Sequence, residues 1–474
     1  MKLKYIIFAL TVAGLSSCDK GLEDANINPN ETPVAQPDYL LSSAIKSSAD
    51  EYWGTANNLN ATLLFVQHVA KIQYTDVDRY IFTSSSFEEP WKYFYSKSLA
   101  DLSEIITLAD ANNTPNYKAV SLVLRSWVFG LLTDSYGDIP YTQAINIDSY
   151  ITPVYDSQQT VYHGILSELK QAVSLFDANS KAISGDLIYN GNLTKWKRFA
   201  NSLRLRYALR IADREPELAK STIAELPLTD LIAAGDIAQL TYQVSPNQNP
   251  IAAFFETRDD YRVSKTIVDK LKSLNDPRLA VYANKPTDVS VTDYVGVPNG
   301  LLTSDASALG FAKTSKLGSY FTAATTPAVI LTPAEALFDR AEAAARGFTT
   351  EDAAALYNQA ITASFAQFGI TDAATIAAYL ANVNVKYDAT NFRKSIGQQK
   401  WIALFGQGLE AYAEWRRLDY PQLTSAVAGK LNGKIPQRYI YPGTEQSLNG
   451  KNYKAAVASQ GDDALLTKLW FDVN

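Results

Sequence analysis

The chain of 474 residues has a single cysteine and only two histidines. One cysteine excludes an internal disulfide, so stability must come from buried area, and 47% hydrophobic residues are enough to build a core. The histidines lack HExxH spacing and no GxSxG sequence is present, which argues against a zinc hydrolase or a serine triad. We expect no cofactor and no metal. Oxygen-rich loops such as 285–305 leave calcium open, although no twelve-residue calcium loop is visible.

An excess of basic residues is also missing. Lysine and arginine number 43 against 49 aspartates and glutamates, for a formal net charge of −6. No cluster of lysine and arginine offsets this balance, so we expect no nucleic-acid partner.

The N-terminus has the pattern of an export signal. Lys2 and Lys4 precede an uncharged apolar run at 5–15, which is too short for a bilayer that needs about 20 such residues. The run ends in Leu-Ser-Ser-Cys, which resembles the bacterial lipobox, where the cysteine is lipidated and begins the mature protein. We predict a signal peptide at 1–17, lipidation of Cys18, and an Asn/Asp/Pro-rich tether at 18–37.

Apolar residues recur at three- and four-residue spacing over two long stretches, which predicts helical pairs at about 38–225 and 332–420. The intervening part, about 226–331, is rich in Pro, Gly, Asn and Tyr and shows one evident helix near 264–274. A single long helix is expected at about 392–418, and the tail at 421–474 is expected to be loops with one short helix.

The small-residue helix pair that begins at Thr332 is similar to a tetratricopeptide repeat, which needs neighbouring repeats to bury its faces. The predicted fold class is therefore mostly α. We expect one domain at 38–474, a tetratricopeptide-like superhelix of helical hairpins, with an irregular, loop-rich, ligand-contacting part packed on it.

Asp134 and Asp138 lie four residues apart and could form an acid/base pair if one helix continued through both. Gly137 and Pro140 instead predict a turn, where aspartates bond to nearby backbone amides. We favour the structural role.

Nine stretches in order resemble the SusD/RagB family of outer-membrane lipoproteins, in its SusD-like branch. They are the lipobox at Cys18, NINPNETP, LTDSYGDIPYTQA, PVYDSQQTVYHGILSELKQA, GNLTKWKRFANSLRLRYALRI, YRVSKTIVDKLKSLNDPRL, PAEALFDRAEAAARG, QKWIALFGQGLEAYAEWRRLDYP and IPQRYIYPGTEQSLN. The resemblance implies a lipid-anchored protein of the outer membrane that faces the cell exterior. It also implies a role as the lid of a TonB-dependent SusC-like transporter, capturing oligosaccharides or, in some members, peptides. Its motifs are architectural, so no binding residue follows from them.

Candidate binding residues come from the loops. Sugars offer flat C–H faces and many hydroxyls, which aromatic rings and Asp, Asn or Arg side chains can recognise. One cluster is Tyr74, Asp76, Arg79 and Tyr80; the second is Asp260, Tyr261 and Arg262, with Tyr242, Asn247 and Tyr294 as outliers. The alternative for each is a side chain packed onto the scaffold. We assign five tryptophans to the core: Trp91, Trp127, Trp196, Trp401 and Trp470.

Two other functions stay open. A helical glycosidase or polysaccharide lyase needs only two carboxylates in a cleft, but no acid pair here stands out from capping and surface roles. A purely structural repeat protein would hold partner proteins and no small ligand.

Overall fold

The computed structural model describes residues 35–473, so the expected signal peptide, Cys18 and most of the tether lie outside the described residues. Helices dominate and strands are few, which confirms the mostly α fold class. No helix within 35–473 combines the length and the apolar character that a membrane span requires.

The first part of the chain forms a helical body that runs to Ala224. Its elements are α3 (Pro37–Trp53), η1 (Thr55–Thr62), α4 (Leu63–Phe65), β1 (Val69–Lys71), η2 (Val77–Arg79), α5 (Glu88–Tyr93), η3 (Phe94–Leu99), α6 (Ala100–Asn112), α7 (Pro115–Tyr136), α8 (Gln158–Leu175), α9 (Leu193–Arg210) and α10 (Pro216–Ala224).

The middle part is irregular and has short elements. They are β2 (Ala238–Leu240), α11 (Pro250–Phe255), β3 (Tyr261–Val263), α12 (Lys265–Leu274), α13 (Leu279–Tyr282), α14 (Thr303–Ala308), η4 (Phe311–Lys313), α15 (Ser319–Thr322) and β4 (Ala328–Leu331).

Longer helices return after Thr332 and the tail is mostly loops. The elements are α16 (Pro333–Ala345), α17 (Ala353–Gln367), α18 (Ala373–Ala381), η5 (Ala389–Asn391), α19 (Phe392–Ala403), α20 (Gly408–Leu418), α21 (Gly443–Leu448) and α22 (Gly450–Gln460).

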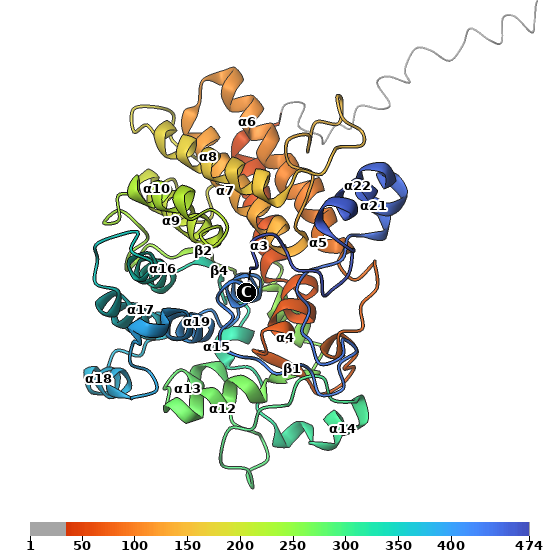
Figure 1. Cartoon of the computed structure of the whole chain (residues 1–474), viewed down its shortest axis with the longest axis vertical. Coiled ribbons are helices and arrows are strands. Elements are labelled where there is room, and N and C mark those ends of the chain that lie inside the picture. Colours follow the sequence, from red (N-terminus) through yellow and green to blue (C-terminus); the bar gives the residue numbers. More distant parts are fainter. Residues whose placement is uncertain (1–34, 474) are drawn as a thin grey trace, which may run out of the picture.

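Successive helices pack as hairpins. Helix α7 packs on α6 and α8, α8 on α9, and α16 on α17 and α19. The contact between α9 and α16 joins the two helical stretches although the irregular part separates them in sequence. Figure 1 shows these helices running down one side of the molecule from α6 to α18, with α12 to α14 at the lower end. The arrangement is the expected superhelix of helical hairpins.

Local sequence explains where these helices begin. Ser157, Asn192, Ser264 and Thr332 each accept a hydrogen bond from a backbone N–H of the first turn with their side-chain oxygen, capping α8, α9, α12 and α16. Helix α7 stops before Gly137, whose φ of 89° lies in the left-handed region that glycine adopts easily.

The prediction of a single long helix at 392–418 is wrong. It is interrupted between Ala403 and Gly408, where Gly406 has a φ of 90° and the chain turns. The apolar spacing continues across the turn because α19 and α20 pack against each other and bury both faces. Likewise, the tail has two short helices and not one.

Two small antiparallel sheets tie the irregular part to the helical body. Strand β1 pairs with β3 in the register Val69↔Val263, and β2 pairs with β4, with a bulge at Ala238/Gln239. One large apolar core runs beneath both sheets and the helices. Trp91, Trp127, Trp196 and Trp401 are buried in it, and the partly buried Trp470 packs against it.

Candidate functional site

Pairing of β1 with β3 brings the two predicted loop clusters together. Lys71, the last residue of β1, is the register partner of Tyr261, the first of β3. Its ammonium lies 2.7 Å from the Asp260 carboxylate and 4.3 Å from the centroid of the Tyr261 ring. The segment from Tyr74 to Tyr80 follows β1 after two residues. Residues far apart in sequence therefore share one surface.

The first cluster presents Tyr74 and Asp76 to solvent. Tyr74 is 58% exposed, Asp76 is exposed, and Arg79 is half-buried. A guanidinium nitrogen of Arg79 lies 3.6 Å from the Asp76 carboxylate, and its Nε donates to the carbonyl of Ala428 at 3.3 Å. Tyr74 is thus the most accessible aromatic ring of the predicted residues.

Four of the predicted side chains are buried, each at most 2% exposed: Tyr80, Asp260, Tyr261 and Arg262. The Tyr80 hydroxyl accepts from the backbone N–H of Ala426 at 3.3 Å, and Arg262 donates to the Thr314 hydroxyl at 3.0 Å. Burial raises the pKa of both tyrosines above the usual value. In this conformation the four side chains support the surface from beneath, and their contact with a ligand stays a prediction.

Arg258 organises the exposed surface. Its guanidinium carbon lies 5.0 Å from the centroid of the Tyr74 ring and 5.6 Å from that of Phe254. Two of its N–H groups donate to the two oxygens of Asp260, at 3.2 and 3.1 Å. Burial alone would raise the pKa of Asp260, but hydrogen bonds from Arg258 and Lys71 outweigh it and hold that pKa below the usual range. The charged carboxylate fixes the guanidinium plane.

A hollow of about 130 Å³ opens beside Arg258, and its lining includes Phe255, Asp259, Asn284, Lys316 and the predicted residue Tyr261. We call Tyr74, Phe254, Phe255 and Arg258, with this hollow, the Arg258 surface. It combines aromatic rings with carboxylate, amide and cationic groups, which is the composition that carbohydrate hydroxyls and C–H faces require.

A larger hollow of about 460 Å³ lies at the other end of α11 and is called here the Glu51 hollow. Its lining includes Asp50, Glu51, Glu89 and Tyr93, together with Pro250 at the start of α11. Burial first, and then the charges of Glu89 and Asp50, raise the pKa of Glu51 to about 8. Glu51 is therefore protonated at neutral pH and can donate a hydrogen bond as well as accept one.

The three outliers lie in different places. Tyr242 is buried behind the Glu51 hollow and donates to the carboxylate of Asp50 at 2.8 Å. Asn247 is exposed beside Gln248, which lines that hollow. Tyr294 is half-buried, and its backbone carbonyl accepts from Lys272 of α12, away from both hollows. The structure thus associates two of the three with a hollow.

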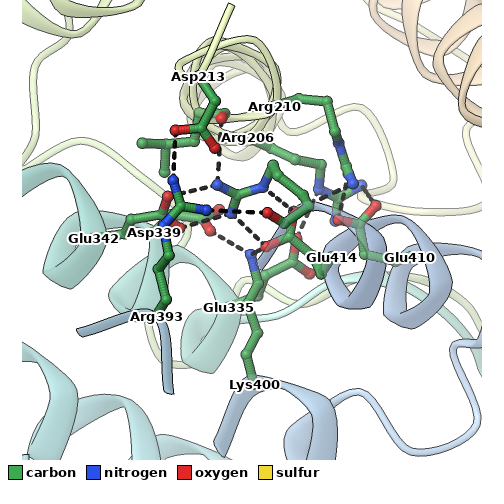
Figure 2. A network of polar contacts seen from close by, with 12 residues as sticks. Arg206, Arg210, Asp213, Glu335, Asp339, Glu342, Arg393, Lys400, Glu410 and Glu414 are labelled. Atoms are coloured by element: carbon green, nitrogen blue, oxygen red, sulfur yellow. Dashed lines mark hydrogen bonds and ion pairs between the residues drawn. The ribbon is translucent and has the colours of Figure 1, made fainter. Parts of the chain in front are cut away.

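The densest group of charges is internal (Figure 2). Arg206 and Arg210 of α9 bond to Glu335 of α16 and Glu410 of α20, at 2.7 and 2.6 Å. Lys400 of α19 adds further pairs to the same group, 2.5 Å from Asp339 of α16 and 2.7 Å from Glu414 of α20. Their side chains are at most 5% exposed, so no substrate reaches them. These ion pairs hold helices together.

Asp134 and Asp138 also have structural partners. Asp134 is buried, accepts from the Tyr162 hydroxyl and lies 3.5 Å from Arg210. Asp138 accepts from the backbone N–H of Gln158 at the start of α8, at 2.9 Å. Over the part of the chain that the structure describes, no group of three or more His, Cys, Asp or Glu residues could hold a metal ion.

Reasoning from the sequence missed Phe254, Phe255 and Arg258. The signal was available, since FFETRDDYR places two aromatic residues and an arginine just before the predicted Asp260 cluster. The two phenylalanines end a short helix whose existence the pattern did not indicate.

Comparison with known proteins identifies the family and the fold. A family model described as starch-binding, associating with the outer membrane (SusD-like), matches residues 29–442. A solved structure called a chitin-binding protein is 28% identical, with a TM-score of 0.84 over 93% of this chain and 100% of its own. A SusD homolog from Bacteroides uniformis is 27% identical, with a TM-score of 0.81 over 92% of this chain and 100% of its own.

A chitin-binding SusD homolog from Flavobacterium johnsoniae is 27% identical, with a TM-score of 0.81 over 92% of this chain and 98% of its own. No curated protein matches the chain in sequence.

Proposed function

Since the chain belongs to the SusD-like family of the outer membrane, we propose that it captures oligosaccharides at the cell surface and passes them to a TonB-dependent SusC-like transporter as its lid. SusD-like proteins bind nutrients and glycans at the outer membrane and are not catalytic. That removes the glycosidase and lyase alternatives and leaves a binding protein.

The observation that carries the proposal is the position of Arg258 between two aromatic rings. Tyr74 and Phe254 lie within 5.6 Å of its guanidinium, and Tyr74 is 58% exposed. A sugar ring can stack on the exposed tyrosine while its hydroxyls accept from the guanidinium and donate to Asp259. The carboxylate of Asp260 holds the guanidinium in place, so little side-chain freedom is lost on binding.

The Glu51 hollow extends the surface. Helix α11 has Pro250 in the lining of the Glu51 hollow and Phe255 in the lining of the smaller one. An oligosaccharide that lies along α11 would contact both. Two of the similar structures are named chitin-binding, so oligosaccharides of N-acetylglucosamine are the first ligands to test. Peptides are the alternative.

The test is a titration calorimetry series with chito-oligosaccharides, malto-oligosaccharides and short peptides. Tyr74→Ala combined with Phe254→Ala should abolish binding of whichever ligand the protein holds. Tyr39→Ala is the matched control, because Tyr39 is 69% exposed at the start of α3 and lines neither hollow. Unchanged affinity in a folded double variant would remove the Arg258 surface from the proposal.

An exposed apolar loop indicates a surface for contact with a protein partner. Ile145, Ile147, Tyr150 and Ile151 are between 37% and 85% exposed in the loop before α8. Such patches mark interaction surfaces. We assign this one to the transporter, and Ile147→Ser with Ile151→Ser should lower the amount of transporter that copurifies. Val289→Ser is the control, at a side chain 95% exposed elsewhere. Equal recovery of the transporter would place the contact on another face.

A further inference from the structure

A third hollow, of about 420 Å³, lies between α12, α17 and the start of α19. Three lysines line it: Lys270 from α12, Lys386 from the loop after α18, and Lys394 from the first turn of α19. The one acid in its lining is Asp388. We call it the lysine hollow. It shares no lining residue with the Glu51 hollow or the Arg258 surface.

Its cations lack the partners that neighbouring lysines have. On α12, Lys265 pairs with Asp269, and Lys272 lies 2.8 Å from Asp293. On α19, Lys400 lies 2.5 Å from Asp339. Within residues 35–473, none of the three lysines of the hollow has a carboxylate within 4.0 Å of its ammonium nitrogen. In a protein with a net negative charge, three lysines without a carboxylate partner therefore line the same hollow.

The polar groups nearby offset these charges only in part. Hydrogen bonds from Thr390 first, and to a smaller extent the charge of Lys394, lower the pKa of Asp388, so this one carboxylate stands against three ammonium groups. Lys270 donates to the side-chain oxygen of Gln398 at 3.3 Å, a neutral acceptor. One oxygen of Asp388 accepts from the backbone N–H and the hydroxyl of Thr390, at 2.9 and 2.6 Å. Ser395 accepts from the backbone N–H of Asp388 at 2.9 Å, which leaves its own hydroxyl hydrogen for another acceptor. The three ammonium groups and the hydroxyl of Ser395 can therefore donate to a further acceptor.

The charges also repel one another. Burial first, and then the charge of Lys394, lower the pKa of Lys270. An anion between the two ammonium groups would reverse the second contribution and offset the first. Asp388, the one acid in the lining, has no carboxylate oxygen within 4.0 Å of the ammonium nitrogen of Lys270 or Lys394.

We propose that the lysine hollow binds an oxyanion, a sulfate or phosphate group, through the ammonium groups of Lys270, Lys386 and Lys394 and the hydroxyl of Ser395. Charge-assisted hydrogen bonds of this kind are the strong ones, and three lysines provide enough donors to surround a tetrahedral anion. The group can be carried by a sulfated or phosphorylated sugar or by a lipid headgroup of the membrane with which the protein associates. Both sources present the same chemistry.

The first experiment measures binding of inorganic sulfate and phosphate to the full chain by titration calorimetry at constant ionic strength. We expect saturable binding of one anion, and Lys270→Gln with Lys394→Gln should weaken it at least about tenfold by removing two charge-assisted bonds. Lys220→Gln with Lys451→Gln, which removes the same charge from exposed sites elsewhere, should leave it unchanged. Lys386→Gln alone provides a second variant at an exposed position if the double variant is unstable.

The second experiment separates the two sources, using the Cys18→Ser chain so that the expected lipid does not contribute. Galactose 6-sulfate is compared with galactose, and vesicles of phosphatidylcholine are compared with vesicles that also contain phosphatidylglycerol. Binding only to the sulfated sugar identifies a glycan substituent, and binding only to the anionic vesicles identifies a headgroup. Absence of saturable binding to every probe, or equal loss in the Lys220/Lys451 control, overturns the proposal.

The proposal of oligosaccharide binding at the Arg258 surface and the proposal of anion binding in the lysine hollow can be tested separately. Tyr74→Ala with Phe254→Ala should abolish binding of neutral oligosaccharide and leave sulfate affinity unchanged. Parallel loss of sulfate binding in that variant would mean that the anion lies at the Arg258 surface and not in the lysine hollow.

Discussion

Arg206 of α9 donates to the carboxylate of Glu335 of α16 at 2.7 Å, across 129 positions of sequence, and each side chain is 1% exposed. The guanidinium also donates to the carbonyl of Ile330, in the strand that leads into α16. Burial alone would lower the pKa of Arg206, but the charges of Glu335 and Glu410 raise it above the usual value. The pair fastens the first helical stretch to the second.

Removing one partner of the Arg206–Glu335 pair should lower the free energy of unfolding. Arg206→Met leaves Glu335 buried without its cation, and we expect a loss of about 3–5 kcal/mol in the free energy of unfolding. Urea unfolding at neutral pH measures it. Arg198→Met is the control on the same helix, because Arg198 is 33% exposed and its pairs with Asp230 and Asp236 should contribute about 1 kcal/mol or less. Equal losses in both variants would contradict this account.

Glu51 should make stability fall as pH rises. Its pKa is about 8 in the folded chain against 4.5 for the ordinary group, so between these values the folded state holds a proton that the unfolded state has lost. Stability therefore declines from about pH 4.5 to 8. Glu51→Gln should reduce this decline in urea unfolding series, whereas Glu217→Gln, at an exposed position, should not. Part of the decline should remain, because burial also raises the pKa of other carboxyls, such as that of Asp78 to about 6. A parallel decline in Glu51→Gln would assign the pH dependence to other groups.

We expect oligosaccharide binding to require the guanidinium group of Arg258, and not only its positive charge. Arg258→Lys keeps the charge but loses the planar, two-bond contact with Asp260 and the stacking on Tyr74, so oligosaccharide affinity should fall by about tenfold. The melting temperature should change little, because the side chain is 43% exposed. Calorimetric titration of both chains measures the ratio. Full affinity in Arg258→Lys would show that only the charge matters.

Gly130 marks a close approach of α7 to α9. A methyl group at this position would meet the Tyr207 hydroxyl at 2.0 Å, so Gly130→Ala should destabilise the fold by about 1–3 kcal/mol. Adding Tyr207→Phe removes only the nearest atom, and two ring carbons would still lie 2.4 and 2.7 Å from the methyl group, so most of the loss should persist. Gly450→Ala is the control, since nothing lies within 4 Å of its added carbon. Thermal and urea unfolding distinguish the three variants.

Cys18 carries the expected anchor. Cys18→Ser should leave the fold intact, because residue 18 precedes the described body, and should release the protein from the membrane fraction. Fractionation followed by immunoblotting measures the release. Retention of the variant in the membrane would remove the lipid from this account. Protease treatment of intact cells tests in addition whether the body faces the exterior.

Much of the helical framework could be predicted from the sequence because its signals are local. Three- and four-residue spacing of apolar side chains, and capping residues such as Ser157 and Thr332, depend on neighbours within a few positions. The same spacing ran unbroken through the turn at Gly406, because helices α19 and α20 on either side of it bury their apolar faces against each other.

By itself, the sequence determined the mostly α class, the resemblance to SusD-like proteins and the loops where aromatic residues gather. Only the tertiary structure decided which of those residues reach solvent. Tyr74 is exposed, whereas Tyr80, six residues later, has its hydroxyl bonded to the backbone of Ala426. Exposure depends on partners that lie hundreds of positions away, and no local pattern encodes them. The three lysines of the lysine hollow line one space for the same reason, because α12 lies far in sequence from the loop after α18 and from α19, and each contributes to its lining.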